Sequence, residues 1–302
     1  MIKKMFPGFG TINSVTLFDD GDSSLLEYIK KRVMEMHHTF SFFESNSEIS
    51  QINQQAGIRP VSVGEDTFRL LSMAICYAKE TKGTFDVTAG SLSEMWRTAI
   101  CTSRLPAEEQ IVSGQVHCDI NKLELDRIHG TAFLQEKGMK LDLGGIAKGY
   151  AADQVRSVLL SQGVRNAQIN FGGTVIVIGK KQKVGIQNPY RKTGIPMGSI
   201  MLKDKAIVTS GSYERGFVYK GKRVHHIIDP RTGRPSGSGI LSVSLIGENA
   251  AMLDALATGI CCLGQKEGVP ILRKHGISAV FVTDDGRVQV TPELQGEMSL
   301  SV

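Results

Sequence analysis

Apolar residues repeat at three- and four-residue spacing in several long segments, which is the pattern of helices with one buried face. The first such segment starts near Asp22, and its apolar positions are Leu26, Ile29, Val33, Met36 and Phe40. A second covers 65–82 and is followed by Gly83, a residue type that often ends helices. Further helices are predicted over 88–99, 146–162, 249–263 and 266–275, and a short one after Pro106.

Shorter segments of alternating or continuous apolar residues predict strands. They are 9–18, 167–171, 174–178, 183–187, 197–202, 206–208, 215–220, 222–228 and 240–246. Lys220-Gly221 and Asp285-Gly286 predict hairpin turns, whereas 44–50 and 100–130 are expected to be rich in loops. Strands in antiparallel runs, with helices grouped elsewhere, favour an α+β fold. We expect one domain over 1–302 that consists of two closely associated lobes, because no repeat or linker divides the chain.

Composition and charge narrow the class of protein. The chain of 302 residues is 41% hydrophobic and 22% charged, which is ordinary for a globular protein. Its net charge of 35 − 30 = +5 is dispersed and not interleaved with aromatic residues, so we expect no nucleic-acid partner. No run of about 18 apolar residues predicts a membrane span.

The cysteines and the N-terminus bear on the compartment. The odd count and apolar surroundings of the five cysteines predict buried thiols in a reducing compartment. They are Cys76, Cys101, Cys118, Cys261 and Cys262. The first residues lack the apolar segment and cleavage site of a secretory signal. A cytoplasmic protein is the expectation.

The segment 141–153 combines two glycines with a lysine. Residues 141–143 are predicted to be a short strand, Gly144 and Gly145 a turn, and Lys148 part of the first turn of the next helix. Glycines let the backbone approach a ligand, and free N–H groups at a helix N-terminus bind anions, most often phosphate. An ordinary strand-to-helix connection has the same pattern, so both interpretations stay open.

The predicted helix 249–263 carries a single charged residue, Asp254, among apolar neighbours. Such a helix is buried, and a buried carboxylate needs a partner. Thr258 lies on the same face four residues later. The two oxygens suit Mg²⁺, which takes few protein ligands and completes its shell with substrate phosphates. In the alternative interpretation Thr258 bonds the carbonyl of residue 254 and Asp254 pairs with a lysine or arginine.

Three further segments carry candidate chemistry. His225 and His226 precede a turn containing Pro230 and Gly233. Because adjacent strand residues point to opposite faces, at most one histidine can face a given site, as general base or phosphate ligand. A structural histidine bonded to the turn is the alternative. Thr84-Phe85-Asp86 offers a ring and a carboxylate, or merely a cap for the next helix, and Thr209-Ser210-Gly211 offers hydroxyls after a strand.

The order of these motifs strongly resembles the ApbE family, the FAD:protein FMN transferases. The motifs are F-G-T at 9–11, S-E-I-S-x-x-N at 47–53, T-F-D at 84–86, L-D-L-G-G-I-A-K-G-Y-A-A-D at 141–153, N-F-G-G at 170–173, T-S-G-S-Y-E-R at 209–215, H-I-I-D-P-R-T-G-R-P at 226–235 and D-A-L-A-T at 254–258. The resemblance runs from about residue 9 to 290. Their combination is far more specific than any one motif.

The resemblance implies an enzyme that binds FAD and Mg²⁺, attaches FMN through its phosphate to a Thr or Ser of a target flavoprotein, and releases AMP. By motif position, it implies magnesium ligands at Asp254, Thr258 and the carbonyl of Gly145. It implies FAD contacts at Thr84, Phe85, Asp86, Asp142, Lys148 and the backbone of Ile228. His226 matches the family histidine associated with transfer and is the leading candidate for the base, with Asp229 or the surroundings of the metal as other candidates.

This chain departs from the family at two aromatic positions. Phe9 stands where the family often has Met, and Phe43 where a Tyr is common; both keep bulk for stacking on flavin or adenine. Many relatives carry an exported lipoprotein signal, which this sequence does not show, so we expect a cytoplasmic acceptor such as the flavin subunit of a soluble reductase. A magnesium-dependent FAD pyrophosphatase and a non-catalytic flavin-binding protein are the alternative functions.

Overall fold

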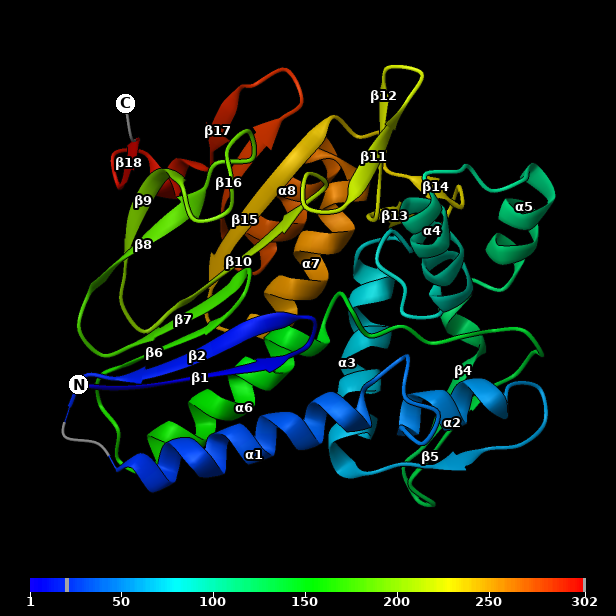
Figure 1. Ribbon diagram of the computed structural model, residues 1–302, viewed down its shortest axis with the longest axis horizontal. Coiled ribbons are helices and arrows are strands. Elements are labelled where there is room, and N and C mark those ends of the chain that lie inside the picture. Colours follow the sequence, from blue (N-terminus) through cyan, green and yellow to red (C-terminus); the bar gives the residue numbers. More distant parts are fainter. Residues whose placement is uncertain (20–21, 301–302) are drawn as a thin grey trace.

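The computed structural model describes residues 1–19 and 22–300 and is built on an eight-stranded sheet (Figure 1). In spatial order the strands are β1 (Ile2–Gly8), β2 (Thr11–Leu17), β6 (Ala167–Phe171), β7 (Thr174–Ile178), β10 (Ala206–Gly211), β15 (Ile240–Gly247), β16 (Ser278–Thr283) and β17 (Val288–Val290). Every neighbouring pair is antiparallel. With the helices described below, this sheet confirms the predicted α+β class.

Helices cover one face of the sheet. They are α1 (Ser23–Thr39), α6 (Ala147–Ser161), α7 (Ala250–Leu263) and α8 (Gln265–Lys274). In α7, which packs between the sheet and α6, every residue except Met252 and Thr258 is buried. Successive side chains of a strand point to opposite faces of the sheet, and here both faces are covered. Ile176 and Ile178 belong to the main core under the helices, whereas Val177 belongs to a second core.

That second core lies under a three-stranded sheet on the opposite face. Its strands are β8 (Gln182–Gln187), β9 (Pro196–Leu202) and β18 (Met298–Leu300), in the order β18-β9-β8. Val184, Ile186 and Ile200 pack here against Val177 and Ile207 of the main sheet. The main sheet is therefore the middle layer between helices and a small sheet.

The remaining elements form a second lobe beside the end of α7 (Figure 1). It contains α2 (Glu48–Gln54), α3 (Glu65–Glu80), α4 (Gly90–Thr102), α5 (Glu108–Val116), a short 3₁₀ turn at 120–122, and the small sheet β3 (Val61–Ser62), β5 (Thr131–Leu134), β4 (Leu123–Asp126). A second 3₁₀ turn, at 292–294, lies against β16 of the main sheet instead. Two hairpins, β11 (Gly216–Tyr219) with β12 (Lys222–His225) and β13 (Ile228–Asp229) with β14 (Arg234–Pro235), lie near the junction. The main core contains residues of both lobes.

Several sequence predictions need correction. Residues 2–8 form β1, which was not predicted, and 44–50 is not all loop because α2 begins at Glu48. The segment 100–130 contains α5 and β4 as well as loops. Residues 141–143 are extended but are not a strand, since their backbone bonds go to the side chain of Asn53 and the carbonyl of Val87. The strand predicted over 222–228 ends at His225.

The prediction of five buried thiols was also too broad. Cys261 and Cys262 on α7 are buried, but Cys76 and Cys101 are exposed and Cys118 is half-buried. All five are free thiols. In the part of the chain that the structure describes, no helix combines the length and apolar character needed to cross a bilayer.

Candidate active site

Three of the sequence motifs lie side by side at one end of the main sheet. A Cβ on Gly172, in the turn between β6 and β7, would lie only 2.9 Å from the Thr11 Oγ1, at the start of β2. The next residue, Gly173, accepts a 2.8 Å hydrogen bond at its carbonyl from the Thr209 amide. The glycines are needed because only a missing side chain permits this close approach. The turn before β2, the β6–β7 turn and β10 therefore form one continuous wall.

Asp254, the only charged residue of α7, binds the first turn of α6. Its carboxylate is 2% exposed and accepts a 3.0 Å hydrogen bond from the Gly149 amide. The ammonium of Lys148 lies 3.7 Å from the same oxygen. A carboxylate at a helix N-terminus is stabilised by the helix dipole as well as by the neighbouring cation.

The contact between α6 and α7 is reciprocal. Asp153 of α6 accepts a 2.9 Å hydrogen bond from the Ala251 amide in the first turn of α7 and pairs with Arg156 at 2.7 Å. Gly149 allows the helices to meet, because a Cβ there would lie 2.2 Å from the carbonyl oxygen of Ala250. We call the Asp254–Gly149 and Asp153–Ala251 pairs the α6–α7 clasp. It fixes Asp254 and Lys148 relative to each other.

The three predicted metal ligands are neighbours. A Cβ on Gly145 would lie 3.1 Å from the Thr258 hydroxyl oxygen, and Thr258 follows Asp254 by one helical turn. The hydroxyl donates a 3.1 Å bond to the Asp254 carbonyl and lies 3.4 Å from the Ser210 hydroxyl. This back-bond and the nearby Lys148 are the contacts of the alternative interpretation, so the metal assignment stays a prediction.

The helix N-terminus offers fewer free donors than expected. The amides of Gly144, Ile146, Ala147 and Gly149 all donate within the protein, to Asp142, Leu143 and Asp254. The expected cradle of unpaired N–H groups is therefore wrong for these four positions. Lys148, whose ammonium also bonds the Gly144 carbonyl at 3.1 Å, supplies the charge that a phosphate would meet at this turn.

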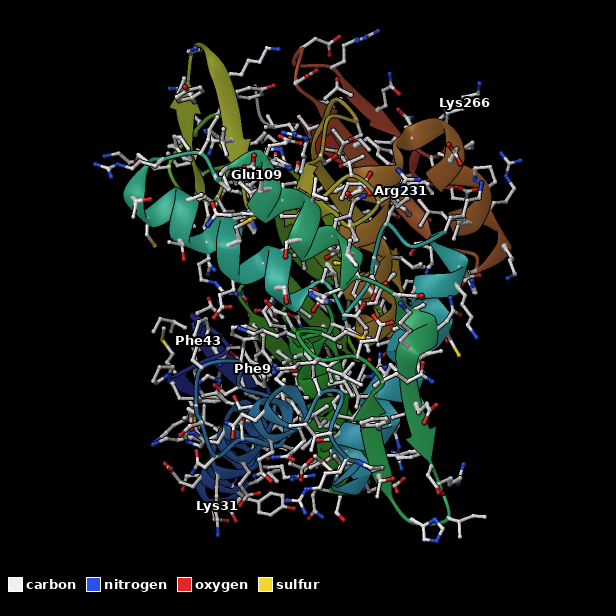
Figure 2. All side chains as sticks on the ribbon, turned by 90° about the vertical axis from the view of Figure 1, so that its right-hand side faces the viewer. Phe9, Lys31, Phe43, Glu109, Arg231 and Lys266 are labelled. Carbon is white, nitrogen blue, oxygen red and sulfur yellow. The ribbon has the colours of Figure 1, made fainter. Side chains whose placement is uncertain are left out.

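Asp142 belongs to a cluster that includes an arginine which sequence reasoning missed. Its carboxylate caps the turn by accepting from the Gly144 amide at 2.8 Å and pairs with Arg97 at 3.0 Å. The Arg97 guanidinium also stacks on the rings of Phe42 and Phe43, at 5.1 and 4.5 Å from their centroids. Phe43 is 72% exposed and projects from the surface in Figure 2. Arg97 therefore connects an exposed aromatic loop to the Gly-Gly turn.

The T-F-D motif is buried and bonded to its own chain. The Thr84 hydroxyl donates to the Thr81 carbonyl at 2.7 Å, and the Phe85 ring lies against Gly145. Asp86 accepts from both the amide and the hydroxyl of Thr88 and from the Ile120 amide. Burial raises the pKa of Asp86, although these hydrogen bonds act in the opposite direction.

The two histidines have different environments, as expected for adjacent residues. His225 is buried, and its Nε2 lies 3.1 Å from the Ser236 carbonyl. His226 is half-buried, with Nδ1 at 3.3 Å from the Arg215 carbonyl. Burial, together with the positive charges of Arg215 and Lys148, lowers the pKa of His226 to about 4. Its imidazole is therefore neutral near pH 7 and is a weaker base than an exposed imidazole.

The remaining predicted contacts lie at the edges of this region. Phe9 has a positive φ of 52°. Its ring packs edge-to-face on that of His37, with the two ring centroids 5.3 Å apart. A Cβ on the following Gly10 would lie 3.5 Å from Arg215, the residue whose carbonyl faces His226. Figure 2 shows Phe9 and Phe43 on the same side of the molecule. The Ile228 carbonyl accepts from the Cys262 thiol at 3.4 Å.

Besides Arg97, Asn53 was not predicted as a site residue, and Ser210 was predicted only as part of a segment that offers hydroxyls. The Asn53 amide bonds both the N–H and the carbonyl of Leu141, at 2.6 and 3.1 Å, and so holds the strand-like segment before the Gly-Gly turn. Ser210 faces Thr258. Both lie within motifs quoted above, which was the available signal. Arg97 lies on an ordinary amphipathic helix and had none.

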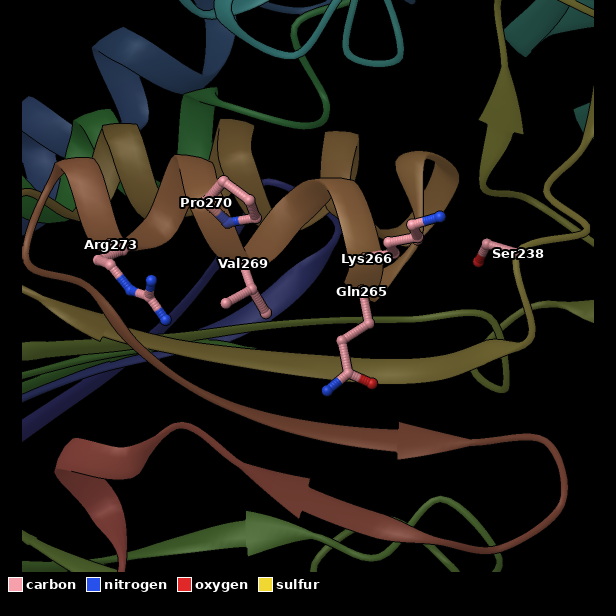
Figure 3. A pocket seen from close by; sticks show the side chains of 7 residues that line it. Ser238, Gln265, Lys266, Val269, Pro270 and Arg273 are labelled. Carbon is pink, nitrogen blue, oxygen red and sulfur yellow. The ribbon is translucent and has the colours of Figure 1, made fainter.

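One surface pocket lies away from these residues. A surface pocket of about 660 Å³ beside α8 is lined by residues that include Ser238, Lys266 and Arg273 (Figure 3). None of the predicted site residues lines it. Within 1–19 and 22–300, no three His, Cys, Asp or Glu side chains gather as a metal site; the predicted ligand set is of another kind, with one carboxylate, one hydroxyl and one carbonyl.

Comparison with known proteins gives a consistent result. The FAD:protein FMN transferase of Klebsiella pneumoniae (strain 342) is 34% identical over 263 residues, covering 87% of this chain and 83% of that protein. The FAD:protein FMN transferase of Treponema pallidum (strain Nichols) is 30% identical over 285 residues, covering 88% and 79%.

Solved structures agree. The ApbE protein from Thermotoga maritima superposes with a TM-score of 0.88 at 31% identity over 98% of both chains. The flavin transferase ApbE from Vibrio cholerae gives 0.82 at 25% identity, also over 98% of both. The model of the ApbE family matches residues 9–281. With relatives of this identity and coverage, the match shows that the chain belongs to the ApbE family.

Proposed function

We propose that this chain is an FAD:protein FMN transferase, which moves the FMN half of FAD onto a Thr or Ser hydroxyl of a target flavoprotein. The single observation that supports this most is the convergence of Asp254, Thr258 and Gly145 beside Lys148, in a chain that is 34% identical to a relative of that name. A diphosphate needs such a combination of oxygen donors for a cation and a fixed positive charge.

In this proposal the magnesium ligands are Asp254, Thr258 and the Gly145 carbonyl. Two of the donors are hard, uncharged oxygens and the third is one buried carboxylate, which suits an ion that keeps positions open for substrate phosphates. When bound, Mg²⁺ neutralises the diphosphate and the leaving phosphate. Lys148, in the first turn of α6 next to the Gly-Gly turn, binds the diphosphate.

The residues proposed to contact FAD are Phe9, Phe43, Thr84, Phe85, Asp86, Asp142, Lys148 and Ile228. Their environments suggest different roles. Exposed Phe43 offers a stacking surface, ordered by Arg97. Thr84 and Asp86 have their side chains engaged within the chain, so we propose that they shape the flavin pocket by holding Phe85 in place.

We propose His226 as the base. Its neutral imidazole takes the proton of the incoming hydroxyl while the oxygen forms a new P–O bond to the FMN phosphorus. The P–O bond of the diphosphate breaks, and AMP leaves with the former bridging oxygen. Atoms and charge balance without any co-reactant.

The test is to incubate the enzyme with FAD and Mg²⁺ alone and then with a co-expressed candidate flavoprotein, followed by mass spectrometry. We expect an FMN-sized mass addition on a Thr or Ser of the acceptor. Rapid FMN release without acceptor, and no adduct with it, would indicate a pyrophosphatase. Binding without any turnover would indicate a flavin carrier.

Two variants test the metal assignment. Asp254→Ala should abolish transfer because it removes the one carboxylate ligand. Asp254→Asn keeps an acceptor for the Gly149 amide, so the fold is retained while the charge is lost. Transfer by either variant at the wild-type rate, at any Mg²⁺ concentration, would refute the assignment.

We also propose that the protein works in the cytoplasm on a cytoplasmic acceptor. The five free thiols fit a reducing compartment. Fractionation of native cells checks this: recovery of the protein from the outer face of the membrane contradicts it.

A further inference from the structure

The β11–β12 hairpin stands apart from the layers of the fold. In Figures 1 and 2 it projects beyond the body of the molecule. Its strands pair with each other, Phe217 with Val224 and Val218 with Arg223, and in the described chain they form a sheet of two strands only. A two-stranded ribbon is marginal alone, and this one is supported at its base, where Phe217 and Val224 pack in one hydrophobic cluster with Trp96.

The hairpin's surface is both cationic and apolar. Arg215, Lys220, Lys222 and Arg223 are exposed, and Glu214 is the one acidic residue between 214 and 225. Between these charges Val218 is 67% exposed and Tyr219 is 40% exposed. Binding of a phosphate alone would explain the cations of the hairpin. It would not explain why aliphatic and aromatic side chains are exposed between them. A protein segment with acidic and apolar residues matches both features.

Local contacts hold the hairpin at its tip and at its base. Lys220 and Gly221 at its tip have φ of 47° and 76°, as in the tight turns that match the strand twist. At its base the Arg223 guanidinium bonds the carbonyls of Ser212 and Tyr213, at 3.2 and 2.6 Å. A preformed surface loses little conformational entropy on binding.

The proposed base, His226, directly follows the last residue of the hairpin. Gly216 pairs with His225, and the carbonyl of Arg215 lies 3.3 Å from His226 Nδ1. A polypeptide bound along the hairpin would therefore reach the position where a hydroxyl has to lose its proton.

We propose that the β11–β12 hairpin is the docking surface for the acceptor protein, and that it binds an acidic, partly apolar segment next to the hydroxyl that receives FMN. This inference rests on the proposed function. Lys220 and Lys222 attract the acidic residues, and Val218 and Tyr219 cover the apolar ones. FAD binding uses the Gly-Gly turn and is independent of the hairpin tip.

A charge-reversal pair tests the surface. The probe is a short fluorescein-labelled peptide in which Asp, Glu and Leu residues flank one Thr; its control has Lys at the acidic positions. Binding is measured by fluorescence anisotropy with FAD and Mg²⁺ present. Lys220→Glu/Lys222→Glu should weaken binding of the acidic peptide by about tenfold or more, and added salt should weaken wild-type binding. Val218→Ser should weaken it without changing the salt dependence.

The matched control is Lys180→Glu/Lys181→Glu, which changes net charge equally at two exposed lysines that follow β7, at the end of that strand opposite the Gly172–Gly173 turn. It should bind the acidic peptide like the wild type. FAD affinity should be the same in all variants. Equal affinities of the two double variants, equal binding of the two peptides, or no binding of the acidic peptide overturns the proposal. Hairpin-dependent binding without FMN transfer to any acceptor would instead contradict the proposed function.

Discussion

At the scale of single residues, the proposed base is a histidine whose surroundings keep it neutral. His226 is half-buried, and Arg215 and Lys148 add positive charge around it, so its pKa is lowered to about 4. The unfolded chain, with a histidine pKa of about 6.5, takes up a proton as pH falls through that value, but the native state does not. Acid should therefore favour unfolding through this residue between about pH 6.5 and 4.

We predict that the wild-type protein loses more free energy of unfolding than His226→Gln when pH is lowered from about 7 to 5, measured by denaturant titration. The imidazole signal that is missing from the NMR spectrum of His226→Gln should titrate near pH 4 in the wild type. A titration midpoint of His226 at the ordinary histidine pKa of about 6.5 would contradict the prediction that its surroundings lower this pKa.

At the scale of elements, the α6–α7 clasp determines where Asp254 lies. We predict that Gly149→Ala destabilises the protein by about 2 kcal/mol or more, because the added Cβ would lie 2.2 Å from the Ala250 carbonyl oxygen and the helices would have to separate. In an unconstrained helix the same change stabilises by about 1 kcal/mol, so the sign itself is diagnostic. Urea denaturation gives the free energy, and FMN transfer should fall with it.

Gly237→Ala is the matched control, because a Cβ at Gly237 meets nothing within 4 Å and φ there is ordinary. It should change stability by less than about 0.5 kcal/mol. Equal effects of the two substitutions would mean that the close approach of α6 and α7 does not constrain the helices.

The same scale shows what the sequence could and could not predict. Long segments with helical periodicity, such as α1, α3 and α7, were predicted within a few residues, as were β6 and β7, because their pattern reflects one continuous buried face. The short α2 and β3–β5 were missed, since two to seven residues give too little periodicity. The apolar composition of 141–143 predicts a strand, because it does not reveal that Asn53, 88 positions away, bonds their backbone.

For the site, motif order brought Gly145, Asp254 and Thr258 together correctly as neighbours. Two features of the site were not predictable: the amides at the start of α6 already donate hydrogen bonds within the protein, and Arg97 contacts the site. Both depend on tertiary contacts with residues far along the chain, which no local pattern encodes.

At the scale of the whole molecule, the two lobes share one core. The main hydrophobic cluster includes Ile49 and Leu70 of the helical lobe together with Ile169 and Val243 of the main sheet. Trp96, the single tryptophan, lies outside that cluster in a smaller one and donates a 2.7 Å bond to the Gly233 carbonyl. Its fluorescence therefore reports on the helical lobe, whereas far-UV circular dichroism reports on both lobes.

Because the shared core joins the lobes, we predict that the chain unfolds as one domain. Trp96 fluorescence and circular dichroism should give coincident urea transitions. Trp96→Phe should remove the fluorescence change but leave one dichroism transition, which assigns the signal. A fluorescence transition at lower urea than the dichroism transition would mean that the lobe carrying Trp96 unfolds separately. Asp142, paired with Arg97 of that lobe, would then lose its partner before the sheet unfolds.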